Sequence, residues 1–138
     1  MGYSNEVEQI FPHHIGAEIE SSLRTMKDLP ESARGQINVH IANLISEKRT
    51  ALAQIKDKPG NETAYFFIGL LFIWETARIS IAGTLEERKT SATVQYRTPE
   101  GTTIMGFAGI GIYFFEKYKA SGGNDPGHLQ IMRTFGVQ

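Results

Sequence analysis

Residues 64–74 read AYFFIGLLFIW, and the run ends abruptly at Glu75. A second apolar run, residues 104–115 (IMGFAGIGIYFF), ends in the same way at Glu116. A helix that is apolar on every side must be surrounded by other elements, so the first run predicts a buried helix at the centre of the fold. Both runs are shorter than the roughly 20 apolar residues that cross a bilayer, which favours core elements over membrane segments.

The composition indicates a single soluble domain over residues 1–138. Apolar residues make up 41% of the chain and charged residues 21%, which is ordinary for a globular protein with a core. The net charge of −1 predicts no general attraction to nucleic acid or to an anionic membrane. The absence of cysteine excludes disulfides and thiolate metal sites. The N-terminal segment lacks the pattern of a secretory signal, so we expect a cytoplasmic location.

Two amphipathic helices are predicted before the central run. The first has apolar residues at steps of three and four from Val7 to Leu29, and Pro12 either begins this helix or kinks it. The second is expected to reach about Asp57, and the short link between the two predicts an antiparallel hairpin.

Two polar residues are expected to begin helices. Asp28, followed by Glu31, has the spacing of a capping box and predicts the start of the second helix. Asn61 is expected to cap the helix that enters the central run.

A short antiparallel β-meander is predicted over residues 78–107. Apolar and polar residues alternate in 79–85 and again in 92–97, with a polar tip between them. Residues 98–101 (TPEG) suit a type I turn with a glycine bulge, which predicts a hairpin.

The second apolar run is expected to begin as the third strand of this meander. It becomes a helix near Ala108 that ends at Ser121, and its glycines permit close approach of another backbone. Residues 129–137 alternate and predict a closing strand. The predicted fold class is therefore α+β: a helical hairpin, a buried third helix, the meander, a C-terminal helix and a closing strand.

No catalytic, metal or cofactor motif is evident. Residues 106–111 (GFAGIG) reverse the spacing of the dinucleotide-binding fingerprint, so close packing is the better interpretation. His14 and Glu18 share a helix face, but no second pair of metal ligands accompanies them. Glu75 is expected to pair with Arg78, one helical turn further on.

Cations on apolar faces are the strongest hint of a ligand site. Lys48 falls near the centre of the second helix's apolar stripe, Arg34 at its edge, and Arg133 on the apolar face of the expected closing strand. A cation on such a face must find a partner or extend along its stem to water. Basic groups beside aromatic rings suit a phosphate-bearing or nucleotide-like ligand. The predicted ligand-binding residues are Arg34, Lys48, Arg78, Tyr96, Arg97, Tyr113 and Arg133.

These features favour a non-catalytic, homo-oligomeric protein that binds an anionic small molecule. The alternative is a protein–protein interaction module, such as a small inhibitor or an assembly subunit. A third possibility is an enzyme whose site residues are scattered along the chain. No cofactor, nucleic acid or membrane is expected as a partner.

Overall fold

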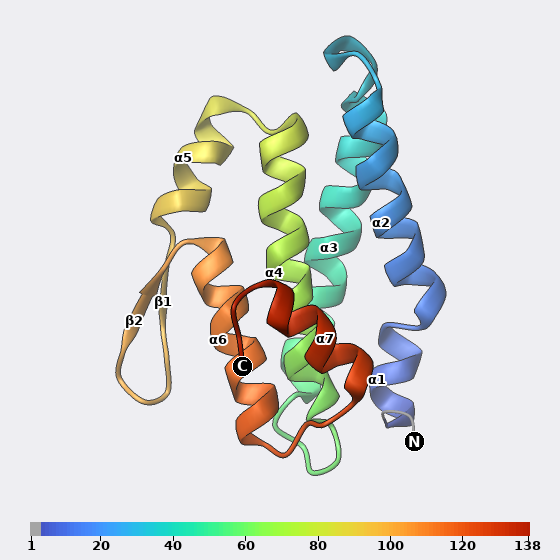
Figure 1. Ribbon diagram of the computed structural model, residues 1–138. Coiled ribbons are helices and arrows are strands. Elements are labelled where there is room, and N and C mark those ends of the chain that lie inside the picture. The colour runs from blue at the N-terminus through green and yellow to red at the C-terminus, as the bar shows by residue number, and fades with distance from the viewer. Residues whose placement is uncertain (1–3) are drawn as a thin grey trace.

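The computed structural model describes residues 4–138, which form seven α-helices, one short 3₁₀ helix and a two-stranded sheet (Figure 1). The predicted α+β class is confirmed. The elements are, in chain order, α1 (Asn5–Ile10), α2 (His13–Asp28), the 3₁₀ helix η1 (Glu31–Ala33), α3 (Gly35–Ile55), α4 (Thr63–Ala82), α5 (Leu85–Thr93), β1 (Gln95–Arg97), β2 (Thr103–Met105), α6 (Phe107–Ala120) and α7 (Pro126–Thr134).

Helix α4 is the centre of the fold, as the first apolar run predicts. It packs against α2, α3 and α6, and its side chains from Phe66 to Leu71 are buried (Figure 1). Among the described residues, α4 is the one helix long and apolar enough to cross a bilayer. Half of that stretch is buried inside the protein, which is the pattern of a core helix.

Glycines bring α4 and α6 into close contact. A Cβ atom on Gly69 would lie 2.7 Å from the Gly111 carbonyl oxygen, and one on Gly111 would lie 2.8 Å from the Gly69 carbonyl oxygen. The close backbone approach expected of the glycines in the second apolar run is therefore present at Gly111. Its partner glycine lies in the first apolar run.

Pro12 separates α1 from α2. Ser4 caps α1 by accepting a hydrogen bond from the Val7 amide, and α1 ends at Ile10. Pro12 then stands at the N-cap of α2, where its missing N–H costs no helical hydrogen bond. Helices α2 and α3 lie side by side as the predicted antiparallel hairpin (Figure 1).

Two expected helix caps are wrong. Asp28 is the last residue of α2 and caps nothing, because Pro30 begins the separate helix η1 before α3 starts at Gly35. Asn61 does not cap α4 with its side chain. Its side-chain nitrogen Nδ2 donates instead to the Ile55 carbonyl oxygen at 3.0 Å, which connects the loop to the end of α3.

The strand predicted over residues 79–85 is also wrong. Helix α4 continues to Ala82, and α5 begins after Thr84 with a capping box. The Thr84 hydroxyl accepts from the Glu87 amide at 3.1 Å, and the Glu87 carboxylate accepts from the Thr84 amide at 3.0 Å. Two caps satisfied together stabilise a helix start, and they outweigh the weak alternation that suggested a strand.

The hairpin at residues 98–101 is confirmed. Strands β1 and β2 pair antiparallel with Tyr96 opposite Ile104. The Gly101 amide donates to the Thr98 carbonyl oxygen at 2.9 Å, and Gly101 has a φ of +91°, the conformation that the bulge requires. The meander thus has two strands where three were expected.

The closing strand predicted over residues 129–137 is a helix in the structure. Asp125 caps α7 by accepting from the Gly127 and His128 amides at 2.9 and 3.2 Å, and Pro126 occupies the first turn. An N-cap aspartate followed by proline favours a helix start. Met132 is buried on the inner face of α7, and the chain ends beside α6 (Figure 1).

Candidate functional site

The predicted ligand-binding residues are dispersed over the fold. Arg34 donates to the carbonyl oxygens of Leu29 and Ile81 at 2.9 and 2.8 Å, so it stabilises the carbonyl ends of α2 and α4. Lys48 lies 3.7 Å from Glu47 on the same helix. Arg97 and Arg133 are exposed on β1 and α7.

Arg78 is a structural hub, and the expected pair with Glu75 is confirmed. Arg78 is 2% exposed and donates to Glu75 at 2.9 Å, to Glu87 at 2.9 Å and to Asn38 at 2.7 Å. Burial lowers the pKa of Arg78, but the hydrogen bonds to Glu75 and Glu87 together raise it above its usual value. Every nitrogen of the guanidinium is thus engaged in joining α3, α4 and α5.

Tyr96 and Tyr113 are brought together. Their ring centroids lie 5.8 Å apart, and Tyr96 also contacts Phe114, which stacks on Phe72 of α4. The Tyr113 hydroxyl donates to Glu100 at 2.8 Å. These rings form a continuous aromatic surface on α4, α6 and β1.

Arg49 lies beside this surface, and sequence reasoning did not identify it. Its guanidinium carbon is 4.6 Å from the centroid of Phe72 and 5.9 Å from that of Phe107. Its Nη1 is buried and has no hydrogen-bond partner among the described residues. Burial lowers the pKa of Arg49, and the Glu75 carboxylate opposes that shift.

The Arg49 cleft is a cavity of about 380 Å³ between α3, α4 and the hairpin. Arg49 and Lys56 are its two cations, and Phe72 and Tyr96 supply ring surface. Its lining residues are Arg49, Thr50, Ala53, Gln54, Lys56, Ile68, Phe72, Tyr96 and Phe114.

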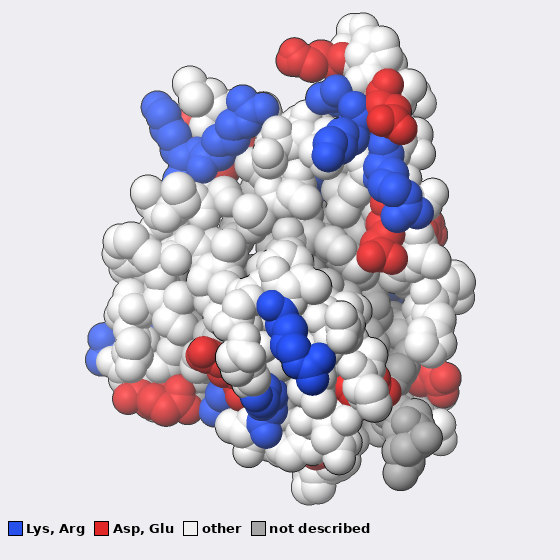
Figure 2. Space-filling view, viewed as in Figure 1, with Lys and Arg blue, Asp and Glu red and all other residues white. Residues whose placement is uncertain are grey.

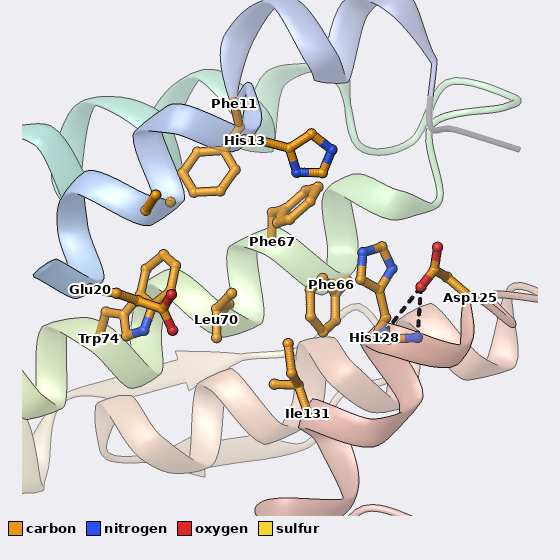
Figure 3. Close-up of a pocket in the computed structure, with 13 residues that line it drawn as sticks. Phe11, His13, Glu20, Phe66, Phe67, Leu70, Trp74, Asp125, His128 and Ile131 are labelled. Carbon is orange, nitrogen blue, oxygen red and sulfur yellow. Dashed lines mark hydrogen bonds between the residues drawn. The ribbon is translucent and has the colours of Figure 1, made fainter.

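A second cavity, the Trp74 pocket, has a volume of about 490 Å³ and lies over α4 between α2 and α7 (Figure 3). Its floor is apolar, with Phe67, Leu70 and Trp74 contributed by α4. Figure 3 shows Glu20 of α2 beside Trp74 at one end and His128 of α7 near Phe66 at the other.

His128 of α7 contacts α4 and α6 at the edge of the Trp74 pocket. Its ring stacks on Phe66 with centroids 4.0 Å apart, and its Nδ1 lies 3.1 Å from the Tyr118 hydroxyl. That hydroxyl also accepts from the Asp125 amide at 3.1 Å. Burial lowers the pKa of His128; Asp125 opposes the shift and His13 adds to it. The neutral imidazole is therefore favoured.

The described residues contain no metal cluster, and the comparisons with known proteins find no match. Among residues 4–138, no group of three or more His, Asp or Glu side chains is placed to hold a metal ion. No protein-family model, curated protein or solved structure matches the chain. We therefore infer the ligand chemistry of the cavities from their lining residues and geometry.

Proposed function

We propose that the protein is a non-catalytic, oligomeric binding protein for a small anionic ligand with a planar ring, of nucleotide-like chemistry. The observation that carries the proposal is the buried Nη1 of Arg49, which has no acceptor among residues 4–138 although it belongs to a cation. An unsatisfied buried donor costs about 1–3 kcal/mol, and more on a charged group. A phosphate or carboxylate oxygen removes that cost.

The walls of the Arg49 cleft suit the rest of such a ligand. Phe72 and Tyr96 offer ring faces for stacking, and Lys56 adds a second positive charge. Lys56 also pairs with Asp57 at 2.7 Å, so Arg49 is the cation more available to a ligand. The cleft volume of about 380 Å³ lies within the range of about 300–1,000 Å³ that is usual for small-molecule sites.

Calorimetric titration with a panel of nucleoside monophosphates tests this proposal. We expect saturable binding, and we expect Arg49→Met to weaken it by about tenfold to a hundredfold, since hydrogen bonds to charged groups contribute about 1.5–3 kcal/mol. Lys48→Met is the matched control, because it removes a positive charge from the adjacent position of α3 and does not line the cleft. No heat with any nucleotide, or equal binding by both variants, would contradict the proposal.

Self-association is the second part of the proposal. Leu85 and Met105 are 67% and 59% exposed, on α5 and β2, which lie on the same side of the fold. The face in Figure 2 has a largely uncharged band across its middle, with basic side chains below its centre and other charged side chains towards its edges. Light scattering tests this part, and a strict monomer would contradict it. A cytoplasmic location is part of the proposal, and a chain without cysteine is compatible with that reducing compartment.

A further inference from the structure

We propose that the Trp74 pocket is a second binding site, specific for a small organic cation with an apolar or aromatic body, such as a quaternary ammonium compound. This site has the opposite electrostatic character to the Arg49 cleft. It shares no lining residue with that cleft, so the two proposals stand independently.

Aromatic rings pack together to form one wall of the pocket. The Phe11 ring lies 4.9 Å from the Phe67 ring and 6.3 Å from the Trp74 ring, centroid to centroid. Figure 3 shows these side chains gathered around the cavity from α4 and from the segment before α2. The face of an aromatic ring attracts a cation, tryptophan most strongly, and quaternary ammonium ions are recognised in this way.

The charges of the lining also favour a cation. Glu20 and Asp125 line the pocket, and no lysine or arginine of the described part of the chain does. Burial lowers the pKa of the His128 imidazole, which favours its neutral form. The first amides of α7 would attract an anion, but Asp125 already accepts from two of them.

The arrangement orients the ligand. Glu20 lies seven residues after His13 on α2, about 10 Å along the helix, so its carboxylate is separated from the end of the pocket where Asp125 and His128 lie. The Asp125 carboxylate already accepts from two amides, which leaves Glu20 as the acid more available to a cation. We place the ammonium group against the Trp74 ring, at the end of the pocket that Glu20 lines. The apolar body then extends over Leu70 towards Phe66 and Ile131.

Trp74 is the only tryptophan in the chain, so its fluorescence reports directly on this pocket. The probe is benzyltrimethylammonium, titrated into the full-length protein, and the control is neopentylbenzene, its neutral carbon isostere. We expect a saturable change in Trp74 emission with the cation and at least about tenfold weaker binding of the isostere, because a desolvated cation–π contact contributes about 2 kcal/mol.

Two variants locate the site. Glu20→Gln removes the charge beside Trp74 and is expected to weaken binding about threefold to tenfold, while the exposed Glu8→Gln on α1 leaves it unchanged. Ala17→Leu extends a side chain from the exposed face of α2 into the pocket and is expected to abolish binding. Circular dichroism checks that each variant is folded. If Ala17→Leu does not fold, Glu20→Gln still tests the site.

The outcomes distinguish a cation site in the Trp74 pocket from the anion site proposed in the Arg49 cleft. Binding of benzyltrimethylammonium that survives Arg49→Met supports an independent cation site. No saturable change in emission, equal affinity for the neutral isostere, or unchanged binding in both Glu20→Gln and Ala17→Leu would each overturn it. An emission change with an alkyl carboxylate in place of the cation would also overturn it, because it would assign the pocket to anions.

Discussion

Gly69 of α4 and Gly111 of α6 face each other so closely that a methyl group on either would lie within 2.8 Å of the other's carbonyl oxygen. Real Cβ atoms do not approach an oxygen so closely, so the two helices would have to separate. A methyl group on Gly69 would also lie 2.7 Å from the ring of Phe115, which is fully buried.

Gly69→Ala is therefore expected to lower the free energy of unfolding by about 1–3 kcal/mol through overpacking. Urea denaturation measures the change. Gly35→Ala is the matched control, because no atom lies within 4 Å of a Cβ there, and it should be neutral or stabilising by up to about 1 kcal/mol. Equal effects of the two substitutions would show that the contact between α4 and α6 is not tight.

Arg78→Met is expected to cost about 3–5 kcal/mol of unfolding free energy. The substitution leaves the Glu75 and Glu87 carboxylates without their common cation, and removing one partner of a buried pair is more costly than the net contribution of the pair. Thermal and urea unfolding measure the loss. Arg88→Met, at an exposed position of α5, should change the stability by no more than about 0.5 kcal/mol. A loss of stability as small as this in Arg78→Met would contradict the role of Arg78 in joining α3, α4 and α5.

Asn61→Ala is expected to destabilise the fold by about 1–3 kcal/mol. Asn61 is 2% exposed, and its side-chain Nδ2 donates to the Ile55 carbonyl oxygen and to the Glu6 carboxylate of α1, each at 3.0 Å. Its loss leaves the Ile55 carbonyl oxygen with the Lys58 amide as its remaining donor, at 3.2 Å, and removes the link to the Glu6 carboxylate. Asn43→Ala, on the exposed face of α3, controls for the loss of an asparagine. Similar unfolding free energies for the two variants would argue against the anchoring role of Asn61.

The stability of the protein is expected to fall as the pH drops below about 6.5, the ordinary pKa of histidine. Burial depresses the pKa of His128 in the folded state, so between the folded and unfolded pKa values the unfolded chain binds a proton that the folded chain does not. Stability is therefore full above pH 6.5 and declines on acidification, by up to about 1.4 kcal/mol per pH unit.

His128→Asn tests this assignment. The asparagine side-chain amide takes the approximate place of Nδ1, where it can donate to or accept from the Tyr118 hydroxyl, but it does not titrate. Between pH 7 and 5, the unfolding free energy of this variant should vary less with pH than that of the wild type. His14→Asn, at an exposed position of α2, should keep the wild-type slope. An unchanged slope in His128→Asn would place the pH dependence elsewhere.

The central helix and the hairpin could be predicted because each depends on a local pattern. An uninterrupted apolar run must be enclosed, and the sequence from Thr98 to Gly101 has few alternatives to a tight turn. Helices α5 and α7 also carried local signals, in the capping-box spacing of Thr84 and Glu87 and in the Asp125–Pro126 pair. Alternation of apolar residues outweighed these signals in the prediction, although over so few residues it does not distinguish a strand from the end of a helix.

The Arg49 cleft could not be predicted in this way. Lys48 and Arg49 are about 100° apart around α3, and their roles depend on how α4 and α6 pack against that helix. The aromatic partners of Arg49, Phe72 and Phe107, lie 23 and 58 residues further along the chain. A helical stripe shows which face is apolar, but it does not show which aromatic ring will lie opposite a given cation.

The central position of α4 has a consequence for synthesis. Its contact with α6 requires residues that leave the ribosome only after α5 and the hairpin have been made. Until then, a nascent chain carries a 20-residue helix with the length and apolar character of a membrane span, and the face around Gly69 has nothing to cover it. A chain that stops before Phe107 would therefore resemble a membrane insertion substrate more than a folding intermediate, so correct folding depends on translation reaching the end of α6.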